Sequence, residues 1–357
     1  MDNDFVLKLQ TKLLSWYHKN KRDLPWRRTS DPYKIWISEA ILQQTRIDQG
    51  TPYYERFVKQ FPTVQDLAKA SLQDVLKMWE GLGYYSRARN LHKAAQIIVN
   101  EHQGKIPQEY VQAIDLPGFG PYTTAAVLSI AYNQDHAVLD GNVIRVLSRV
   151  FAIRENPNET VTKKKLWEKA QELLPLGKAR DYNQAVMELG ALICSPQKPS
   201  CESCPVKTMC QAYKLGIQEQ LPVKSPKKEK PHYEIAVGLV EKSGKVLLIQ
   251  RPEKGLLGGM WEFPGGKREK ESLVECCRRE IQEKTGLAVK VEEELCIVEH
   301  VYSHFSITLH AHRCTPLRMT KTSSNSRWVL YNDIKKYPIH TSNQKVLKAF
   351  QKHKQQH

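Results

Sequence analysis

No stretch of the sequence approaches the ~18 uninterrupted apolar residues that a membrane-spanning helix requires, so we expect no membrane partner. The first ten residues, MDNDFVLKLQ, begin acidic and lack the apolar segment of a signal peptide, which argues against secretion. The eight cysteines do not indicate disulfide bonds in a chain of this length without a signal peptide. We expect instead a reduced compartment in which some thiolates bind metal.

Acidic residues are too few to balance the basic ones. Lys and Arg number 54 against 38 Asp and Glu, and the formal net charge is +16. A surplus of this size indicates a polyanionic partner or an anionic surface. The 357 residues are enough for two or three globular units at roughly 100–200 residues each.

The texture of the sequence changes after residue 231. Before it, apolar residues recur at helical spacing, and Asp31-Pro32 predicts an N-cap followed by the first turn of a helix. The segment 222–231 contains three prolines and mostly positive charge without periodicity, as a solvated linker does. Beyond it, β-branched and alternating segments predict strands around one helix at 271–284, hence an α+β unit.

Four cysteines form the pattern C-x6-C-x2-C-x5-C, at Cys194, Cys201, Cys204 and Cys210. Thiolates this close in sequence can converge on one metal centre. Structural zinc sites usually pair two short C-x2-4-C knuckles, whereas only one short knuckle exists here. The spacing alone leaves zinc and an iron–sulfur cluster equally open. The remaining four cysteines lack such spacing and are expected to be core thiols.

A glycine-rich turn, Leu116-Pro117-Gly118-Phe119-Gly120-Pro121-Tyr122, precedes a predicted helix. Gly118 and Gly120 allow the backbone to turn tightly and approach a ligand. The following helix offers free N–H groups to an anion. Together with the positive charge, this pattern is typical of a helix–hairpin–helix that grips a DNA phosphate without reading sequence, although a lone G-x-G is usually just a turn.

Two carboxylates stand out as candidates for acid–base chemistry. On a helix, Glu39 would lie beside Ile35, Trp36 and Leu42, where loss of hydration would raise its pKa as a general acid requires. The alternative is a glutamate on a solvated face. Asp140 immediately precedes a predicted helix, so it is either an N-cap or a carboxylate kept ionised by helix N–H groups, and both can hold. One raised and one depressed carboxyl pKa suit cleavage of a glycosidic bond.

These residues together resemble the adenine DNA glycosylase (MutY) family of the helix–hairpin–helix superfamily. The resemblance also covers Leu24-Pro25-Trp26-Arg27, the segment Trp36 to Thr45 ending Gln43-Gln44-Thr45, and Gly81-Leu82-Gly83-Tyr84-Tyr85-Ser86. It implies a multi-domain fold with an all-α glycosylase domain over 1–221, a linker over 222–231 and an α+β Nudix-like domain over 232–357. Within the first domain, it implies a six-helix module at about 30–133 and an iron–sulfur module made of 1–29 and 134–221.

The resemblance implies excision of adenine mispaired with 8-oxoguanine or guanine, by hydrolysis of the N-glycosidic bond after base flipping. Glu39 would protonate adenine N7 and later activate water, while Asp140 would stabilise the oxocarbenium ion or form a transient covalent adduct. By position, the resemblance places Asn142 and Tyr122 in the catalytic site. It assigns Arg27 and Gln44 to contacts with the base or DNA. It assigns Leu82 and Tyr84 to the base stack, and Gly118 and Gly120 to the phosphate. Without the resemblance, Tyr84-Tyr85 would be ordinary packing.

Two cofactor expectations accompany the resemblance. It favours one 4Fe–4S cluster over zinc for the four cysteines, and it extends to a monovalent cation at the helix–hairpin–helix.

Position 122 bears on the reaction type, because endonuclease III-like enzymes carry there a Lys that forms a Schiff base and cleaves the strand. Tyr122 has no amine, so we predict a monofunctional glycosylase. The alternative is a bifunctional endonuclease III-like oxidised-pyrimidine glycosylase/AP lyase.

The second domain contains a Nudix box, G-x5-E-x7-R-E-U-x-E-E-x-G-U. The pattern is fitted by Gly265, Glu271, Arg279, Glu280, Ile281, Glu283, Gly286 and Leu287. Lys284 replaces the last glutamate and puts a cation where Mg²⁺ would bind. We therefore expect the fold without Nudix Mg²⁺, which speaks against a nucleotide pyrophosphohydrolase fused to a DNA-binding module. The domain would instead read 8-oxoguanine, as the family uses it.

The tripeptide Tyr302-Ser303-His304 matches the family's Phe-Ser-His loop, with Tyr in place of Phe. The resemblance assigns 8-oxoguanine recognition to it, whereas from the residues alone His304 would be a plain loop histidine. We expect a monomeric, cytoplasmic and nucleoid-associated protein of bacterial type that binds double-stranded DNA holding A:8-oxoG or A:G. A non-enzymatic DNA-binding protein is the remaining alternative, and the Glu39–Asp140 pair speaks against it. No motif identifies a protein partner.

Overall fold

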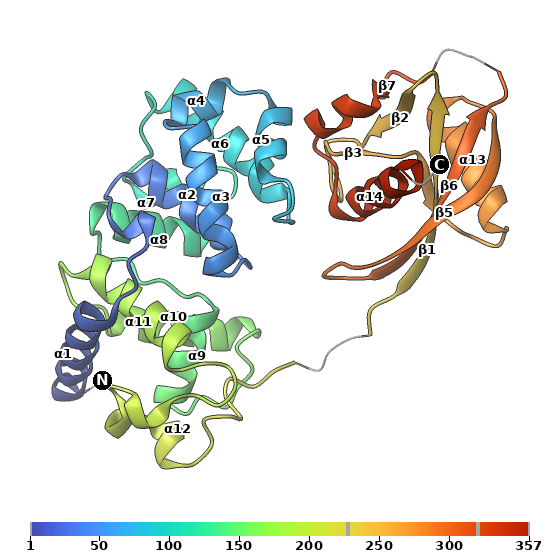
Figure 1. Cartoon of the computed structure of the whole chain (residues 1–357). Coiled ribbons are helices and arrows are strands. Elements are labelled where there is room, and N and C mark those ends of the chain that lie inside the picture. Colours follow the sequence, from blue (N-terminus) through green and yellow to red (C-terminus); the bar gives the residue numbers. More distant parts are fainter. Residues whose placement is uncertain (1, 226–228, 319–321, 356–357) are drawn as a thin grey trace. The chain divides into compact units, whose positions relative to one another are not determined.

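The computed structural model describes residues 2–225, 229–318 and 322–355 (Figure 1). It divides into two compact units, one made of Met1–Lys69 and Lys93–Lys227, the other of Ala70–His92 and Lys228–His357. The predicted linker at 222–231 spans the passage from the first unit to the second, and its residues 226–228 lie outside the described residues. In the described ranges, no helix has both the length and the apolar character needed to cross a bilayer.

The first unit is helical. Its α-helices are α1 (Asn3–Asn20), α2 (Pro32–Leu42), α3 (Ile47–Gln60), α4 (Val64–Lys69), α7 (Tyr110–Ala113), α8 (Pro121–Tyr132), α9 (Gly141–Val150), α10 (Thr160–Glu172), α11 (Ala179–Leu192) and α12 (Gln211–Lys214). Helix α6 (Ser86–Glu101) runs through both units. Short 3-10 turns occur at Pro25–Arg27, Cys201–Ser203 and Lys207–Met209.

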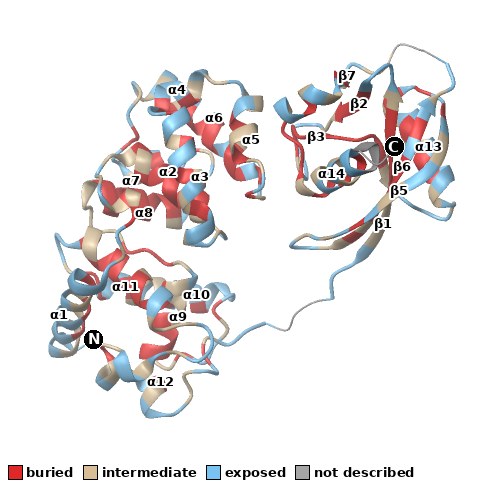
Figure 2. Ribbon diagram, in the orientation of Figure 1, coloured by how far each residue is buried: buried red, intermediate tan, exposed pale blue. Residues whose placement is uncertain are grey.

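Two central helices of this unit, α2 and α8, are buried along most of their length and pack against each other (Figure 2). The predicted start of α2 is confirmed, because the Asp31 side chain accepts a hydrogen bond from the Tyr33 amide at 2.9 Å and Pro32 opens the helix. In α8 every residue from Thr123 to Ala131 is buried. Polar side chains placed at the ends of these two helices are therefore held by a rigid apolar core.

The second unit contains a mixed seven-stranded sheet. Its strands are β1 (His232–Lys242), β2 (Lys245–Gln250), β3 (Trp261–Glu262), β4 (Gly265–Lys267), β5 (Val289–Val301), β6 (Ser306–Pro316) and β7 (Ser326–Leu330). The order is β3-β2-β1-β6-β5, with β4 on β1 and β7 on β2. Strands β1 and β6 are parallel, and the other pairs are antiparallel.

Helices cover both faces of this sheet. Alternate residues of β6 point to opposite faces, so Leu309 and Cys314 belong to different apolar clusters. The Leu309 cluster includes Val346 of α14 (Thr341–Gln355), and the Cys314 cluster includes Ile281 of α13 (Leu273–Thr285). The predicted α+β fold is confirmed. The sequence missed helix α14 and the short strands β3, β4 and β7, and these strands carry too few residues for a pattern.

The segment Ala70–His92 groups with the second unit rather than with the helices on either side of it in sequence. It contains α5 (Leu72–Trp79). The Gln73 side chain accepts a hydrogen bond from the Trp261 indole at 2.8 Å, and the Glu80 carboxylate accepts one from the Ile339 amide at 2.8 Å. This segment therefore holds Tyr84 within the same unit as the β5–β6 turn.

Candidate active site

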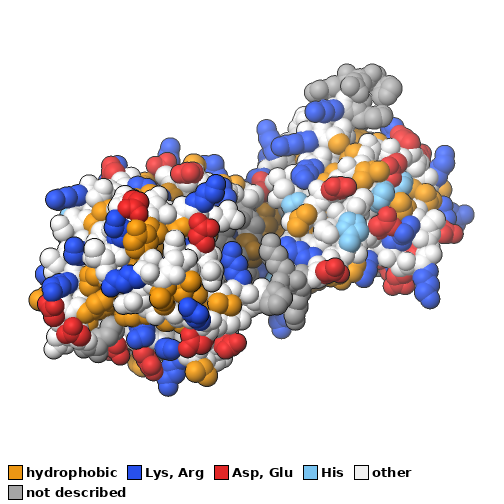
Figure 3. Space-filling model, turned by 90° about the horizontal axis from the view of Figure 1, so that it is seen from below, with side chains coloured by type: hydrophobic (Ala, Val, Ile, Leu, Met, Phe, Trp, Pro, Cys, Tyr) orange, Lys and Arg blue, Asp and Glu red, His pale blue; other side chains and the backbone are white. Residues whose placement is uncertain are grey.

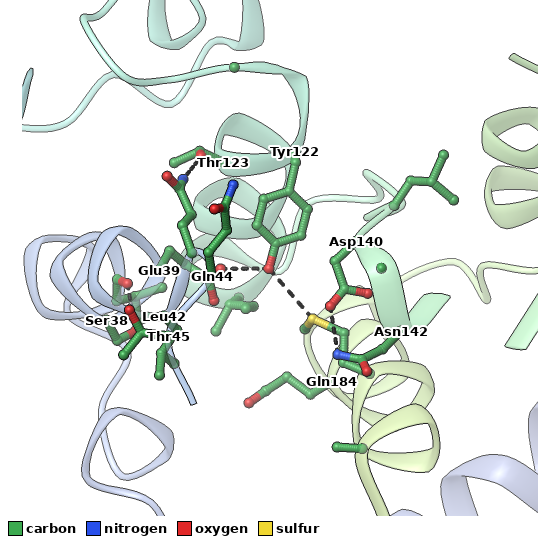
Figure 4. A pocket seen from close by; sticks show the side chains of 18 of the residues that line it. Ser38, Glu39, Leu42, Gln44, Thr45, Tyr122, Thr123, Asp140, Asn142 and Gln184 are labelled. Atoms are coloured by element: carbon green, nitrogen blue, oxygen red, sulfur yellow. Dashed lines mark hydrogen bonds between the residues drawn. The ribbon is translucent and has the colours of Figure 1, made fainter. Parts of the chain in front are cut away.

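A cavity of about 990 Å³ opens in the first unit, between side chains of α2, α8, α9, α10 and α11 (Figure 4). It is lined by Glu39, Tyr122, Asp140 and Asn142, which the sequence proposes as catalytic. The sequence predictions for Arg27, Gln44, Gly118 and Gly120 fall on the same lining. These residues come from widely separated segments, so one cavity joins most of the predicted site.

Glu39 lies in the last turn of α2 and is 8% exposed, so the alternative of a solvated glutamate is wrong. Burial raises its pKa to about 7, and the negative charge of Asp140 adds to this rise. A hydrogen bond from Tyr122 and the positive charge of Arg27 oppose it. A carboxyl with this pKa is substantially protonated near neutral pH and can donate a proton to a bound base.

Tyr122 stands in the first turn of α8, directly after the glycine-rich hairpin. Its hydroxyl donates a hydrogen bond to Glu39 Oε2 at 2.6 Å and approaches the Met187 sulfur at 3.6 Å. In Figure 4 this hydroxyl lies between the carboxyl groups of Glu39 and Asp140. Burial raises the pKa of Tyr122, so it stays a neutral donor that orients the Glu39 carboxyl.

Asp140 is the N-cap of α9. Its carboxylate accepts hydrogen bonds from the Val143 amide at 2.7 Å and from the Asn142 side chain at 2.8 Å. The predicted depressed pKa is wrong in direction, because burial raises the pKa of Asp140 and outweighs the lowering by those hydrogen bonds. Asp140 both caps α9 and lines the cavity, so the capping role and a place in the site are compatible.

The Asn142 side chain is held in place by Arg145, a residue that the sequence analysis missed. Arg145 Nη2 donates to Asn142 Oδ1 at 2.7 Å, and its Nε donates to the Cys194 carbonyl at 2.6 Å. A chain of hydrogen bonds thus joins Asp140 to the backbone of the first cysteine of the four-cysteine loop. Asn142 and Arg145 are three residues apart on one helix, and this spacing could have predicted their contact.

Arg27 lines the cavity, but its guanidinium is engaged by a buried carboxylate. Glu188, 1% exposed, accepts hydrogen bonds from Arg27 Nη1 and Nη2 at 2.9 and 2.8 Å and from Arg22 Nε and Nη2 at 2.9 and 2.6 Å. Burial alone would raise the pKa of Glu188, yet the hydrogen bonds of both arginines lower it to about 2. More than 150 residues separate the partners in sequence, so no local pattern could identify this cluster.

The hairpin glycines have the geometry that a close ligand requires. Gly118 has φ +84°, in the left-handed region that favours glycine. A Cβ added at Gly120 would meet no atom within 4 Å, so the backbone there is open toward the cavity. Gln44, another residue of the lining, also has a positive φ of 60°. The arrangement suits an anion held by backbone N–H groups at the start of α8.

The four cysteines line one small cavity beside α9 and α11. Arg149 Nη1 donates a hydrogen bond to the Cys194 sulfur at 3.3 Å. Four thiols on one lining are a donor set that an iron–sulfur cluster can take, with one thiolate for each iron.

In the second unit, the structure brings Tyr84 to the predicted recognition loop. Tyr84 has φ +48°, an uncommon conformation for a residue other than glycine, and its side chain is 43% exposed. Its hydroxyl forms a hydrogen bond with the Ser303 hydroxyl in the β5–β6 turn. His304 is exposed in that turn, while Tyr302 packs on the apolar core. Leu82 is only 7% exposed, so it does not project from the surface as Tyr84 does.

In the Nudix helix, α13, two basic side chains form ion pairs with the carboxylates of the Nudix box. Arg279 contacts the carboxylates of Glu271, Glu280 and Glu283 at 2.7, 2.9 and 3.3 Å. Lys284 donates to the Gly265 carbonyl and lies 3.2 Å from Glu280. Arg279 and Lys284, both on α13, thus pair with the carboxylates of the Nudix box.

Comparison with known proteins identifies both units. The profile of the HhH-GPD superfamily of base excision DNA repair proteins matches residues 37–172, and the NUDIX domain profile matches 236–349. The chain is 34% identical to the adenine DNA glycosylase of Rattus norvegicus, over 98% of this chain and 79% of that protein. It is 35% identical to that of Homo sapiens, over 97% of this chain and 74% of that protein.

Solved structures resemble the helical part. A thermostable thymine-DNA glycosylase is 33% identical with a TM-score of 0.55, covering 60% of this chain and 98% of that one. Endonuclease III from a non-covalent complex with DNA is 19% identical with a TM-score of 0.53, covering 61% of this chain and 99% of that one. At this identity the second likeness concerns the fold.

Proposed function

Because this chain belongs to the adenine DNA glycosylase family of base-excision enzymes, we propose that it removes adenine mispaired with 8-oxoguanine. The observation that carries the proposal is the buried Glu39 carboxyl, with a pKa of about 7, which shares one cavity with Asp140. The cavity, at about 990 Å³, has room for a purine nucleoside flipped out of the duplex.

Glu39 donates its proton to adenine N7, and this weakens the bond between N9 and the sugar. As that bond breaks, its electron pair leaves with adenine and positive charge develops on the deoxyribose. Asp140 stabilises this cation, held in place by Asn142 and the start of α9. The carboxylate of Glu39 then takes a proton from water, whose oxygen attaches to the sugar and leaves an abasic site.

The reaction stops at the abasic site. Strand cleavage through a Schiff base requires an amine, and Tyr122 offers only a hydroxyl already donated to Glu39. We therefore prefer a monofunctional enzyme to the bifunctional glycosylase/lyase. A borohydride-trapped covalent adduct with DNA in high yield would refute this part of the proposal.

We propose that the four-cysteine loop holds a 4Fe–4S cluster through Cys194, Cys201, Cys204 and Cys210, which line one cavity. Such a cluster supplies a rigid cross-link for the loop and a redox centre. Arg149 is the buried residue of α9 that binds this loop, through the Cys194 sulfur and the Ser195 carbonyl. Iron and sulfide analysis of the purified chain should give about four of each per protein, and zinc in their place would overturn the assignment.

The second unit is proposed to read 8-oxoguanine through Ser303 and His304. A Ser303→Ala/His304→Ala variant should lose preference for A:8-oxoG over A:G while keeping the rate of chemistry on A:G. Ser324→Ala, an exposed serine of the same unit, is the control. An unchanged preference would assign the discrimination to other residues.

Excision itself is tested with duplexes that hold A:8-oxoG, thymine glycol or no lesion, each with and without alkali. Adenine release with strand scission only after alkali supports the proposal. Glu39→Gln should abolish excision and leave duplex binding largely intact, while Glu55→Gln, an exposed glutamate on α3, should change neither. Near-normal excision by Glu39→Gln would show that the acid is another group.

A further inference from the structure

Helix α10 turns one face toward the active-site cavity. Four of its residues line the cavity, namely Thr160, Lys163, Lys164 and Trp167. Their spacing of three, four and seven residues places them on a single helical stripe. Both lysine side chains are exposed, so they are hydrated and accessible to a ligand at the mouth of the cavity.

The arginine side chains on the cavity wall already donate hydrogen bonds to a carboxylate of the protein. Arg22 and Arg27 both donate to the buried Glu188 through two nitrogens each. Lys163, in contrast, makes no side-chain hydrogen bond or ion pair that reaches a described residue. Lys164 has only a 3.9 Å contact with Glu168, and these side chains are 78% and 60% exposed. Such an exposed pair contributes little and is readily exchanged for another anion.

We propose that Lys163 and Lys164 bind the phosphodiester groups that flank the nucleotide flipped into this cavity. The inference rests on the proposed function, since it requires an extrahelical nucleotide there. A flipped nucleotide brings its two phosphates to the mouth of the cavity, where exposed lysine side chains stabilise them. The hairpin amides at Gly118 and Gly120 supply a second phosphate site on the same lining, so α10 holds the strand at a second point.

Basic charge alone does not single out these two lysines. Lys and Arg side chains are spread over the visible face of the molecule rather than gathered in one patch (Figure 3). What distinguishes Lys163 and Lys164 is their position on the cavity lining. The next residue, Lys165, lies off the stripe and pairs with Glu155 at 2.9 Å, so it is a matched control on the same helix.

The test measures equilibrium binding of the full chain to two fluorescent duplexes of equal length over a series of KCl concentrations. One duplex holds a tetrahydrofuran abasic analogue opposite 8-oxoguanine, and the other is fully paired. For Lys163→Ala/Lys164→Ala, the salt dependence of log K should become shallower by about 0.9 for each phosphate that is no longer neutralised, on the abasic duplex only. Lys165→Ala should leave both duplexes unchanged, and Lys163→Arg/Lys164→Arg should retain the original slope.

An equal reduction in slope on both duplexes would overturn the inference, because it would show that the lysines act as general surface charge. An unchanged slope on both duplexes would overturn it as well. The binding comparison contains no adenine at the target position, so its outcome is independent of excision. A chain that binds as described but releases no adenine from A:8-oxoG would refute the proposed function alone.

Discussion

Replacing Glu39 by Gln should remove a pH-dependent cost of folding. The pKa of Glu39 is about 7 in the folded chain, against 4.5 for an ordinary glutamate. Between these two values the folded state binds the proton more tightly than the unfolded state does. Stability from this group is therefore fully present below about pH 4.5 and is lost as the pH rises through about 7.

The magnitude follows from the size of this shift. One pKa unit corresponds to about 1.4 kcal/mol, so the rise in the pKa of Glu39 from 4.5 to about 7 costs the folded state about 3 kcal/mol at alkaline pH. Gln has nearly the same shape and no charge. The free energy of unfolding of Glu39→Gln minus that of the unsubstituted chain should thus grow by about 3 kcal/mol between about pH 4.5 and about pH 8.5.

Urea unfolding of the two proteins, followed by tryptophan fluorescence over this pH range, measures the difference. Groups that do not interact with Glu39 titrate equally in both proteins and cancel. Single-turnover excision by the unsubstituted chain should fall above about pH 7, with the same apparent pKa, because only the protonated acid can donate. A difference in stability that does not vary with pH would refute the buried-acid reasoning. A difference that grows while excision stays constant would show that Glu39 is not the acid.

Two further predictions concern the groups around this acid. Tyr122→Phe removes a hydrogen bond that lowers the pKa of Glu39, so the alkaline fall in single-turnover excision should move to higher pH; a move to lower pH would contradict the geometry. Glu188→Gln leaves the half-buried Arg22 and Arg27 beside a neutral amide and should cost about 3 kcal/mol in urea unfolding near neutral pH. Because the pKa of Glu188 is lowered to about 2, its contribution should vanish as the pH falls from about 4.5 toward 2, and a cost that persists in acid would contradict the charged pairing.

Interactions between near neighbours were readable from the sequence. The cap at Asp31 and Pro32, the turn at Gly118 and Gly120 and the helical or strand periodicity each depend on a few adjacent residues. The exchange of glutamate for Lys284 in the Nudix box is equally local, because the helix places it one turn from Glu280. Such features follow from backbone geometry, whatever the rest of the chain does.

The properties of the site depended on residues distant in sequence. Apolar neighbours on its own helix suggested a shielded Glu39, but its burial also requires α8, which supplies Tyr122 83 positions away. For Asp140 the local hydrogen bonds predicted a lowered pKa, and the burial imposed by surrounding elements reversed the direction. The sequence by itself determined the helices, turns and motifs that depend on near neighbours. Only the tertiary structure decided which side chains lose water and which charges meet, because desolvation and charge pairing depend on every element that surrounds a group.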